Sequence, residues 1–283
     1  MKIAGGDSEE RIGRLTRTAI SVNTPHHGTP LANRFITMQS QTLLLLLTAL
    51  ATSGHGRGAV LAAAKALALV AGFDDWLGRT ESSLDRIAEG LLRKIRFDRR
   101  DPVWTYLREI EKDQGAVLQL TPEGIELFDA AVADRAGINY GCVVAGVPRP
   151  REEFRVRDVV DPEYIALRAL FRLLYSLTAE SHPRYPYPKP TRATQRRLDR
   201  GLGFQATPGT NDGIVPMLSQ LHGRVLHVAR ADHLDVIGHY TLAGGSTGNW
   251  LPSGAGFTRE AFDATWEAVA AAIARGGQGP DSG

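Results

Sequence analysis

Three short runs of apolar and β-branched residues, unevenly spaced, constrain the fold of this 283-residue chain more than any other feature. They read TAISV (18–22), INYGCVVAGV (138–147) and RVLHVA (224–229). Each is typical of a buried β-strand, and segments with helical periodicity lie between them. Strands that alternate with helices predict an α/β fold in which helices cover a mostly parallel sheet. More than a hundred residues separate the first two runs, so we expect a large helical insertion in a sheet of few strands.

The chain is therefore predicted to divide into an α/β core and an inserted helical part. The core would comprise residues 1–36 and 138–275. The insertion, residues 37–137, is expected to form a cap or lid over it. Residues 276–283 are expected to be a disordered tail.

Prolines mark the starts of several predicted helices. Thr29-Pro30 and Thr121-Pro122 each begin one, since threonine can cap a helix and proline fits its first position. The second helix is expected to have an apolar face made of Ile125, Phe128, Val132 and Ala136. Another helix is expected to start at Asp161-Pro162.

The C-terminal third combines a proline-rich loop with a closing helix. Closely spaced prolines predict an extended loop over residues 181–195. The closing helix is expected to begin near Thr258 and to end at Gly276-Gly277. Its apolar stripe would be Phe262, Trp266, Val269 and Ile273.

Composition excludes several classes of protein. The hydrophobic content of 43% is ordinary for a soluble chain, and a net charge of +2 gives no argument for nucleic-acid binding. The single Cys142 excludes an internal disulfide and a cysteine-based metal site, and its place in an apolar run indicates a structural thiol. The most apolar segment, residues 42–52, is shorter than the roughly 20 residues of a membrane-spanning helix. Residues 1–17 are polar, unlike a signal peptide, and the compartment stays open.

Two polar segments carry the candidate chemistry. TNDGIVP (210–216) places Asp212 in an Asn-Asp-Gly turn, and ADHLDVIGHY (231–240) places His233 just after the third predicted strand. Active groups of α/β proteins lie beyond the carboxyl ends of the strands. An acid after one strand and a histidine after the next therefore predict an orienting carboxylate and a general base.

At these residues the sequence resembles a known family. The pattern NDGIVP…SQL…HVARADHLDVIGHY looks like the C-terminal end of an α/β-hydrolase of the bacterial lipase and esterase kind. VNTPHHGTPLA resembles the strand and loop that follow the nucleophile elbow in that group. The resemblance covers 18–36 and about 138–275. It implies that Asp212 and His233 are the acid and base of a catalytic triad, with an ester or lipid substrate and no cofactor.

Three further polar residues have alternative interpretations. In some related lipases the aspartate at the position of Asp235 helps to bind calcium, but a solvated or helix N-terminal carboxylate is the favoured interpretation. Calcium needs about six to eight oxygen ligands, and no others can be identified here, so no metal site is predicted. His26 and His27 are interpreted as structural residues of the loop that starts a helix.

The nucleophile has no convincing candidate. In this fold the serine precedes the acid and the histidine. Ser8 is the sole serine before the first strand run, and no strand precedes it. GGSTG (244–248) matches G-x-S-x-G, but Ser246 follows both Asp212 and His233 and lacks the strand and helix of an elbow. We therefore expect the serine to lie outside this chain, which would be the C-terminal part of a longer hydrolase.

Two functions remain from the sequence. The first is a serine ester hydrolase in its full-length form, inactive as this chain alone, whose helical insertion lines an acyl pocket and contacts lipid interfaces. The second is a non-catalytic binding or interaction protein that lacks the nucleophile. The basic stretch TRATQRRLDRG (191–201) is interpreted as a solvated helix face, and neither a nucleic-acid partner nor a transmembrane segment is expected.

Overall fold

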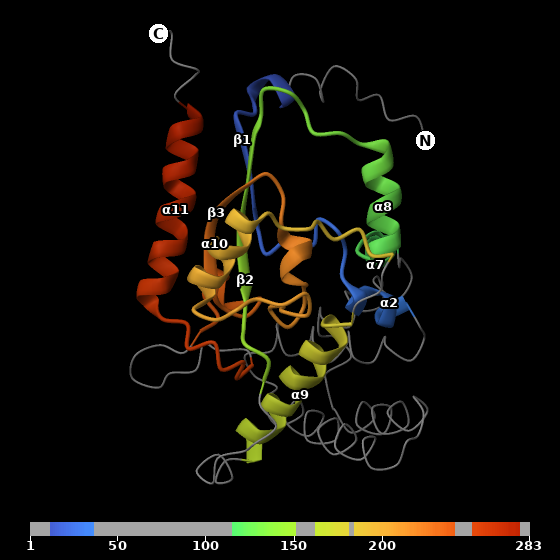
Figure 1. Cartoon of the computed structure of the whole chain (residues 1–283), viewed down its shortest axis with the longest axis vertical. Helices are drawn as coiled ribbons and strands as arrows, with labels where there is room; N and C mark the ends of the chain where they lie inside the picture. Colours follow the sequence, from blue (N-terminus) through green and yellow to red (C-terminus); the bar gives the residue numbers. More distant parts are fainter. Residues whose placement is uncertain (1–11, 37–114, 151–161, 181–183, 241–250, 278–283) are drawn as a thin grey trace, which may run out of the picture.

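A three-stranded parallel sheet lies at the centre of the protein (Figure 1). The computed structural model describes residues 12–36, 115–150, 162–180, 184–240 and 251–277. The strands are β1 (Thr18–Val22), β2 (Asn139–Gly146) and β3 (Arg224–Arg230), in the order β1-β2-β3. Each lies within one residue of its predicted bounds. The small open sheet with its helices confirms the α/β class.

The strand register brings the carboxyl ends of all three strands to the same edge of the sheet. Thr18 pairs with Asn139 at one end of the β1–β2 ladder, and Val22 pairs with Val143 at the other. β2 then continues past β1 and pairs with β3 as far as Gly146. The β2–β3 register shifts beside Cys142, so Leu226 has no Cα partner there. Such a bulge bends the strand locally and increases its twist.

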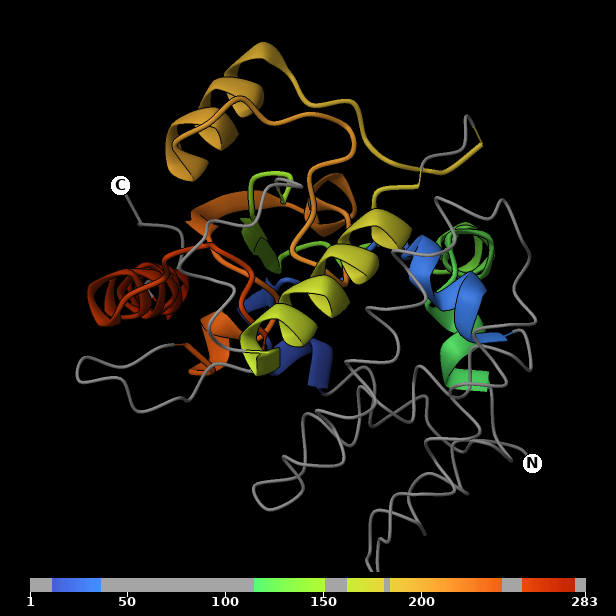
Figure 2. The same ribbon diagram turned by 90° about the horizontal axis from the view of Figure 1, so that it is seen from below.

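Helices cover both faces of the sheet, and Figure 2 shows the layers end on. On one face lies α10 (Arg192–Leu202), whose Leu198 and Leu202 pack against Cys142 and Val144 of β2. On the other face lies α11 (Arg259–Gly277), and α9 (Pro162–Thr178) lies near the carboxyl end of β2. The core there is built from both helices, both longer strands and the segment after β3; its fully or nearly fully buried members include Ala145, Val147, Phe171, Leu174, Ala231, Val236 and Leu251.

The described part of the predicted insertion consists of two short helices. They are α7 (Gly115–Gln119) and α8 (Pro122–Ala131), and they lie beside α2 (Pro30–Ile36). Thr121 caps α8 as predicted, since its hydroxyl accepts a hydrogen bond from the Gly124 amide at 2.9 Å. The predicted apolar face of α8 is wrong. The helix ends at Ala131, and the side chains of Phe128 and Val132 are 53% and 52% exposed.

Two boundaries predicted from the sequence also need correction. The proline-rich loop ends earlier than residue 195, because the Thr191 hydroxyl accepts from the Thr194 amide and α10 begins at Arg192. At the C-terminus, α11 continues through Gly277, so the first two residues of the predicted tail are helical. The remaining tail, and residues 37–114 of the predicted insertion, lie outside the described residues.

Cys142 is fully buried in β2, as predicted for a structural thiol, and burial raises its pKa. Within the described segments, none of the helices is both long and apolar enough to span a bilayer.

Candidate acid–base site

Residues that follow each of the three strands meet at the carboxyl edge of the sheet. Asn23 comes directly after β1, and His233 comes shortly after β3. Asp212 lies in a turn whose neighbour Asn211 forms a bridge with Val147, just beyond β2. The His233 amide donates to the Asp212 carbonyl at 3.0 Å, so the two loops are also joined through their backbones.

Asp212 and His233 form a direct pair, as the sequence spacing suggested they could. The distance between His233 Nδ1 and Asp212 Oδ2 is 2.8 Å. Asp212 is completely buried, whereas 26% of the His233 side chain is exposed. One ring nitrogen is thus occupied by the carboxylate while part of the imidazole reaches the surface. This is the arrangement in which a carboxylate fixes the tautomer of a histidine.

The Asp212 carboxylate is held by its own turn. Oδ1 accepts hydrogen bonds from the amides of Ile214 and Val215 at 2.9 and 2.7 Å. The turn needs Gly213, whose φ of +96° lies in the left-handed region and whose missing Cβ leaves room for the ring of Phe171. These contacts hold the carboxylate in place before any ligand is bound.

Burial and the Asp212 carboxylate act on the pKa of His233 in opposite directions. Burial by itself would lower the pKa of His233, because it disfavours the charged imidazolium. The Asp212 carboxylate raises that pKa through its charge and its hydrogen bond, and the nearby Asp232 acts in the same direction. The net result is a raised pKa, which stabilises the imidazolium that forms when the ring takes up a proton.

Gln220 supports the pair, and sequence reasoning missed it. This buried residue ends the short 3-10 helix η2 (Met217–Gln220). Its side-chain amide nitrogen donates to Asp212 Oδ2 at 3.2 Å. The same side chain accepts from the Ala145 amide at 2.7 Å and donates to the Ala145 carbonyl at 3.1 Å. Beyond the end of β1, the Gln220 side chain therefore makes the pair of hydrogen bonds with the β2 backbone that a neighbouring strand would make. In the sequence it stands only in the SQL segment of the resemblance, where no role was assigned to it.

Asn23 was also missed. It is the one non-glycine residue with positive φ in the described chain, at 51°, a conformation that asparagine tolerates better than most residues. Its amide donates to the Val143 carbonyl at 3.2 Å, which extends the β1–β2 ladder. Its side-chain nitrogen donates to the His233 carbonyl at 3.4 Å. Asn23 thus ties the end of β1 to the histidine loop.

Asp235 starts the 3-10 helix η3 (Asp235–Ile237), which agrees with the helix N-terminal interpretation. The solvated interpretation is wrong, because only 2% of Asp235 is exposed. Asp235 Oδ2 accepts from the Asp232 amide at 2.9 Å, and Asp232 Oδ1 accepts from the Asp235 amide at 3.1 Å. Burial and then the Asp232 carboxylate raise the pKa of Asp235 to about 8. Among the described residues, no three His, Cys, Asp or Glu side chains lie close enough to hold a metal ion.

His26 and His27 lie in the loop before α2 and contact the segment between η2 and β3. The His26 ring stacks on that of His222, with centroids 4.4 Å apart. His27 Nε2 lies 3.2 Å from the Leu221 carbonyl oxygen. Burial and the neighbouring His222 lower the pKa of His26 to about 4. These contacts agree with the structural role expected of the loop.

No serine takes the place of a nucleophile in the described part of the chain. The serines there are Ser21, Ser176, Ser219 and Ser253, and none hydrogen-bonds to His233. Ser219, for example, donates to the Gly28 carbonyl at 2.6 Å and accepts from the His27 amide. Ser8 and Ser246 lie outside the described residues.

Comparison with known proteins adds no assignment: no protein-family model matches the sequence, and no curated protein matches it significantly.

Proposed function

We propose that this protein is part of a serine ester hydrolase in which His233 is the general base and Asp212 its orienting acid. The observation that carries the proposal is the 2.8 Å contact between His233 Nδ1 and the fully buried Asp212 carboxylate, at the carboxyl edge of a parallel sheet. Active groups of α/β folds lie at this edge. The resemblance of both loops to bacterial lipases and esterases supports the same assignment.

In the proposed reaction, a serine hydroxyl attacks the carbonyl carbon of the ester and passes its proton to His233 Nε2. The imidazolium then protonates the leaving alcohol, and a water molecule, deprotonated by His233, hydrolyses the acyl-serine to the acid. Asp212 stays ionised throughout and stabilises the imidazolium. The serine is the unassigned part of this machinery, since no described serine contacts His233.

We propose further that the helical insertion acts as a cap that contacts lipid. Its described helices, α7 and α8, and the residues that directly follow them expose several large apolar side chains. These are Leu118, Leu120, Leu127, Phe128 and Val132, exposed by 42% to 76%. An apolar surface of this kind suits the interface of an emulsified long-chain ester. The substrate class that it favours is therefore a lipid rather than a short soluble ester.

The experiment measures hydrolysis of p-nitrophenyl esters of several acyl chain lengths, by this protein and by any longer product of the same gene. Activity that falls by about four orders of magnitude in His233→Ala and in Asp212→Asn would support the assignment. His239→Ala is the matched control, because His239 is exposed and lies on the same loop. Unchanged activity in both site variants would overturn the proposal.

A non-catalytic binding role is the second candidate, and the absence of a described serine beside His233 favours it. A fluorophosphonate probe, which labels activated serines, separates the two. Labelling that requires His233 supports the hydrolase. A protein that stays unlabelled and hydrolyses none of the esters is the non-catalytic relative.

A further inference from the structure

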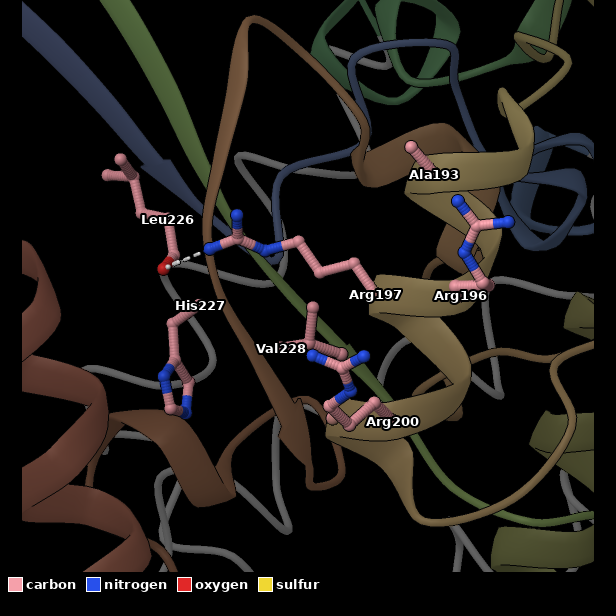
Figure 3. Close-up of a pocket in the computed structure, with 8 residues that line it drawn as sticks. Ala193, Arg196, Arg197, Arg200, Leu226, His227 and Val228 are labelled. Carbon is pink, nitrogen blue, oxygen red and sulfur yellow. Dashed lines mark hydrogen bonds between the residues drawn. The ribbon is translucent and has the colours of Figure 1, made fainter.

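A second site is formed on the opposite side of β3, away from the acid–base pair. A cavity of about 550 Å³ lies between α10 and the outer edge of β3 (Figure 3). Its lining includes Arg196, Arg197 and Arg200 of α10, together with Leu226 and His227 of β3. Figure 3 shows Arg197 reaching from the helix to the strand and Arg200 lying beside Val228. Its lining contains no acidic side chain.

The three arginines have different roles in the fold. Arg197 Nη2 donates to the Leu226 carbonyl at 3.1 Å. Because β3 is an edge strand among the described strands, this contact satisfies an edge carbonyl at the bulge and protects the edge. Arg196 and Arg200 are exposed and make no hydrogen bond or ion pair with the described residues. Edge protection therefore explains Arg197 and leaves the other two unexplained.

The charges on α10 are uncompensated within the described chain. Arg192, Arg196 and Arg200 are spaced four residues apart and lie along one face of the helix, where like charges destabilise it. The first turn contains no acidic residue to offset Arg192. Asp199 is the only acid of α10, and its Oδ1 already accepts from Gln195 and from the Ala206 amide. An anion bound from outside the helix would offset these charges.

An adjoining cavity extends the positive surface. It is lined by Lys189, His222 and Arg224 and shares Arg197 with the first cavity. None of its lining residues is acidic. Two neighbouring cavities thus present permanently charged guanidinium groups with no anionic partner in their lining.

We propose that the cavity between α10 and β3 binds a phosphate group, either of a free phosphorylated metabolite or of an anionic lipid headgroup. A guanidinium donates in a fork that matches two oxygens of an oxyanion. A tetrahedral phosphate has oxygens for two forks from different directions, which a planar carboxylate lacks. The cavity volume falls in the range of small-molecule sites, so it favours a single phosphate group over a polymer.

The test measures binding of inorganic phosphate by calorimetry at constant ionic strength, and of phosphatidylcholine vesicles with and without phosphatidic acid. The key variant is Arg196→Gln/Arg200→Gln, which keeps the Arg197 contact with β3. We expect it to lose at least about tenfold in affinity, the effect of roughly one charge-assisted hydrogen bond. Arg230→Gln is the matched control, because Arg230 is an exposed arginine of β3 that does not line the cavity.

Two readouts keep folding defects separate from loss of the site. Removing like charges from α10 should leave the melting temperature of the double variant unchanged or slightly raised. In addition, burial and Arg197 lower the pKa of His227, and an anion bound beside it should raise that pKa in an NMR titration. Phosphate bound elsewhere would leave His227 unaffected.

Each outcome either identifies the source of the phosphate or overturns the proposal. Binding of inorganic phosphate that the double variant loses identifies a free phosphorylated ligand. Binding only to vesicles that contain phosphatidic acid, again lost in the variant, identifies a headgroup. Equal binding of acetate, tighter binding of a single-stranded oligonucleotide, full retention by the double variant, or no binding of either probe would overturn the proposal.

Discussion

Asp212 is the residue on which the candidate site depends most. Its Oδ1 accepts from two backbone amides and its Oδ2 from Gln220 and His233, all away from water. A carboxylate is the only common side chain that accepts at every one of these positions. Asparagine has the same shape, but its side-chain N–H groups would face Gln220 and His233, which are themselves donors.

We therefore expect Asp212→Asn to lower the pKa of His233 and to reduce the free energy of unfolding by about 2–4 kcal/mol. The raised folded pKa means that protonated His233 adds stability at acid pH, and that this is lost as pH rises through the folded pKa. NMR titration of His233 and denaturant unfolding measure the two effects. Asp263→Asn, at an exposed surface pair, is the control. An unaltered His233 pKa in the Asp212 variant would contradict this account.

Asp235 should make the protein less stable as pH rises. Its folded pKa of about 8 lies far above the roughly 3.9 of a free aspartate, so the native state keeps a proton that the unfolded state has released. Its contribution to stability therefore falls between about pH 4 and pH 8. Asp235→Asn mimics the protonated form and should be more stable than the parent near pH 8 but equal to it near pH 4. Unfolding curves of the two proteins that stay parallel across this range would refute it.

The sequence predicted the pair of residues but not their supports. Asp212 was found as an acid in a turn-forming segment before the third strand run, and His233 was found because it follows that run directly. Gln220 and Asn23 contribute through contacts with β2 and with the histidine loop, which join positions far apart in the sequence. The raised pKa of Asp235 depends on burial, and the sequence pattern at that position was equally compatible with solvent exposure.

At the level of elements, local signals located the strands and the helix starts well. β1 and the first residue of α8 are where their β-branched run and Thr-Pro pair predict them. Periodicity was less reliable, since the apolar residues predicted for one face of α8 lie at a largely exposed surface. A periodic pattern shows that residues share a face, but whether another element covers that face depends on tertiary packing.

Close packing of α10 on β3 gives a prediction for Gly201. An added Cβ at this position would lie 2.5 Å from the Cβ of Val228 and 3.0 Å from its carbonyl oxygen. Alanine favours a helix over glycine by about 1 kcal/mol, yet we expect Gly201→Ala to lower the free energy of unfolding by about 1–3 kcal/mol, because overpacking outweighs propensity. Denaturant unfolding measures the change. Adding Val228→Ala should restore part of the loss, and a Gly201→Ala protein more stable than its parent would show that α10 can move away.

At the scale of the whole molecule, the sheet formed by the described strands has β1 and β3 as its outer strands. The amide of Asn23 bonds β2, and the Asn139 amide bonds the Arg17 carbonyl, so odd-numbered residues of β1 pair with β2. In a parallel ladder the alternate residues, Ile20 among them, then direct their N–H and C=O groups away from β2. Such an edge is a template for pairing with another chain.

We expect the protein to self-associate as its concentration rises and expect Ile20→Pro to reduce this, because proline removes an outward donor without removing a β1–β2 hydrogen bond. Light scattering after size-exclusion chromatography gives the mass. Ser21→Pro is the matched control and should destabilise the fold instead, since its N–H belongs to the β2 side. Equal association by the Ile20 variant and its parent would place the contact elsewhere.

The β1–β2 pairing also has a consequence for how the protein folds. It joins positions 120 residues apart, as in the contact between Ser21 Oγ and the Gly141 carbonyl. The chain must close this loop before the pairing gains any contacts, so β1 should join late and refolding should be slow for a protein of this size. The free energy of unfolding is far less sensitive to the length of this loop, because each doubling of a flexible loop costs only about 0.6 kcal/mol. Changes in the length of the intervening segment should therefore alter the refolding rate much more than the final stability.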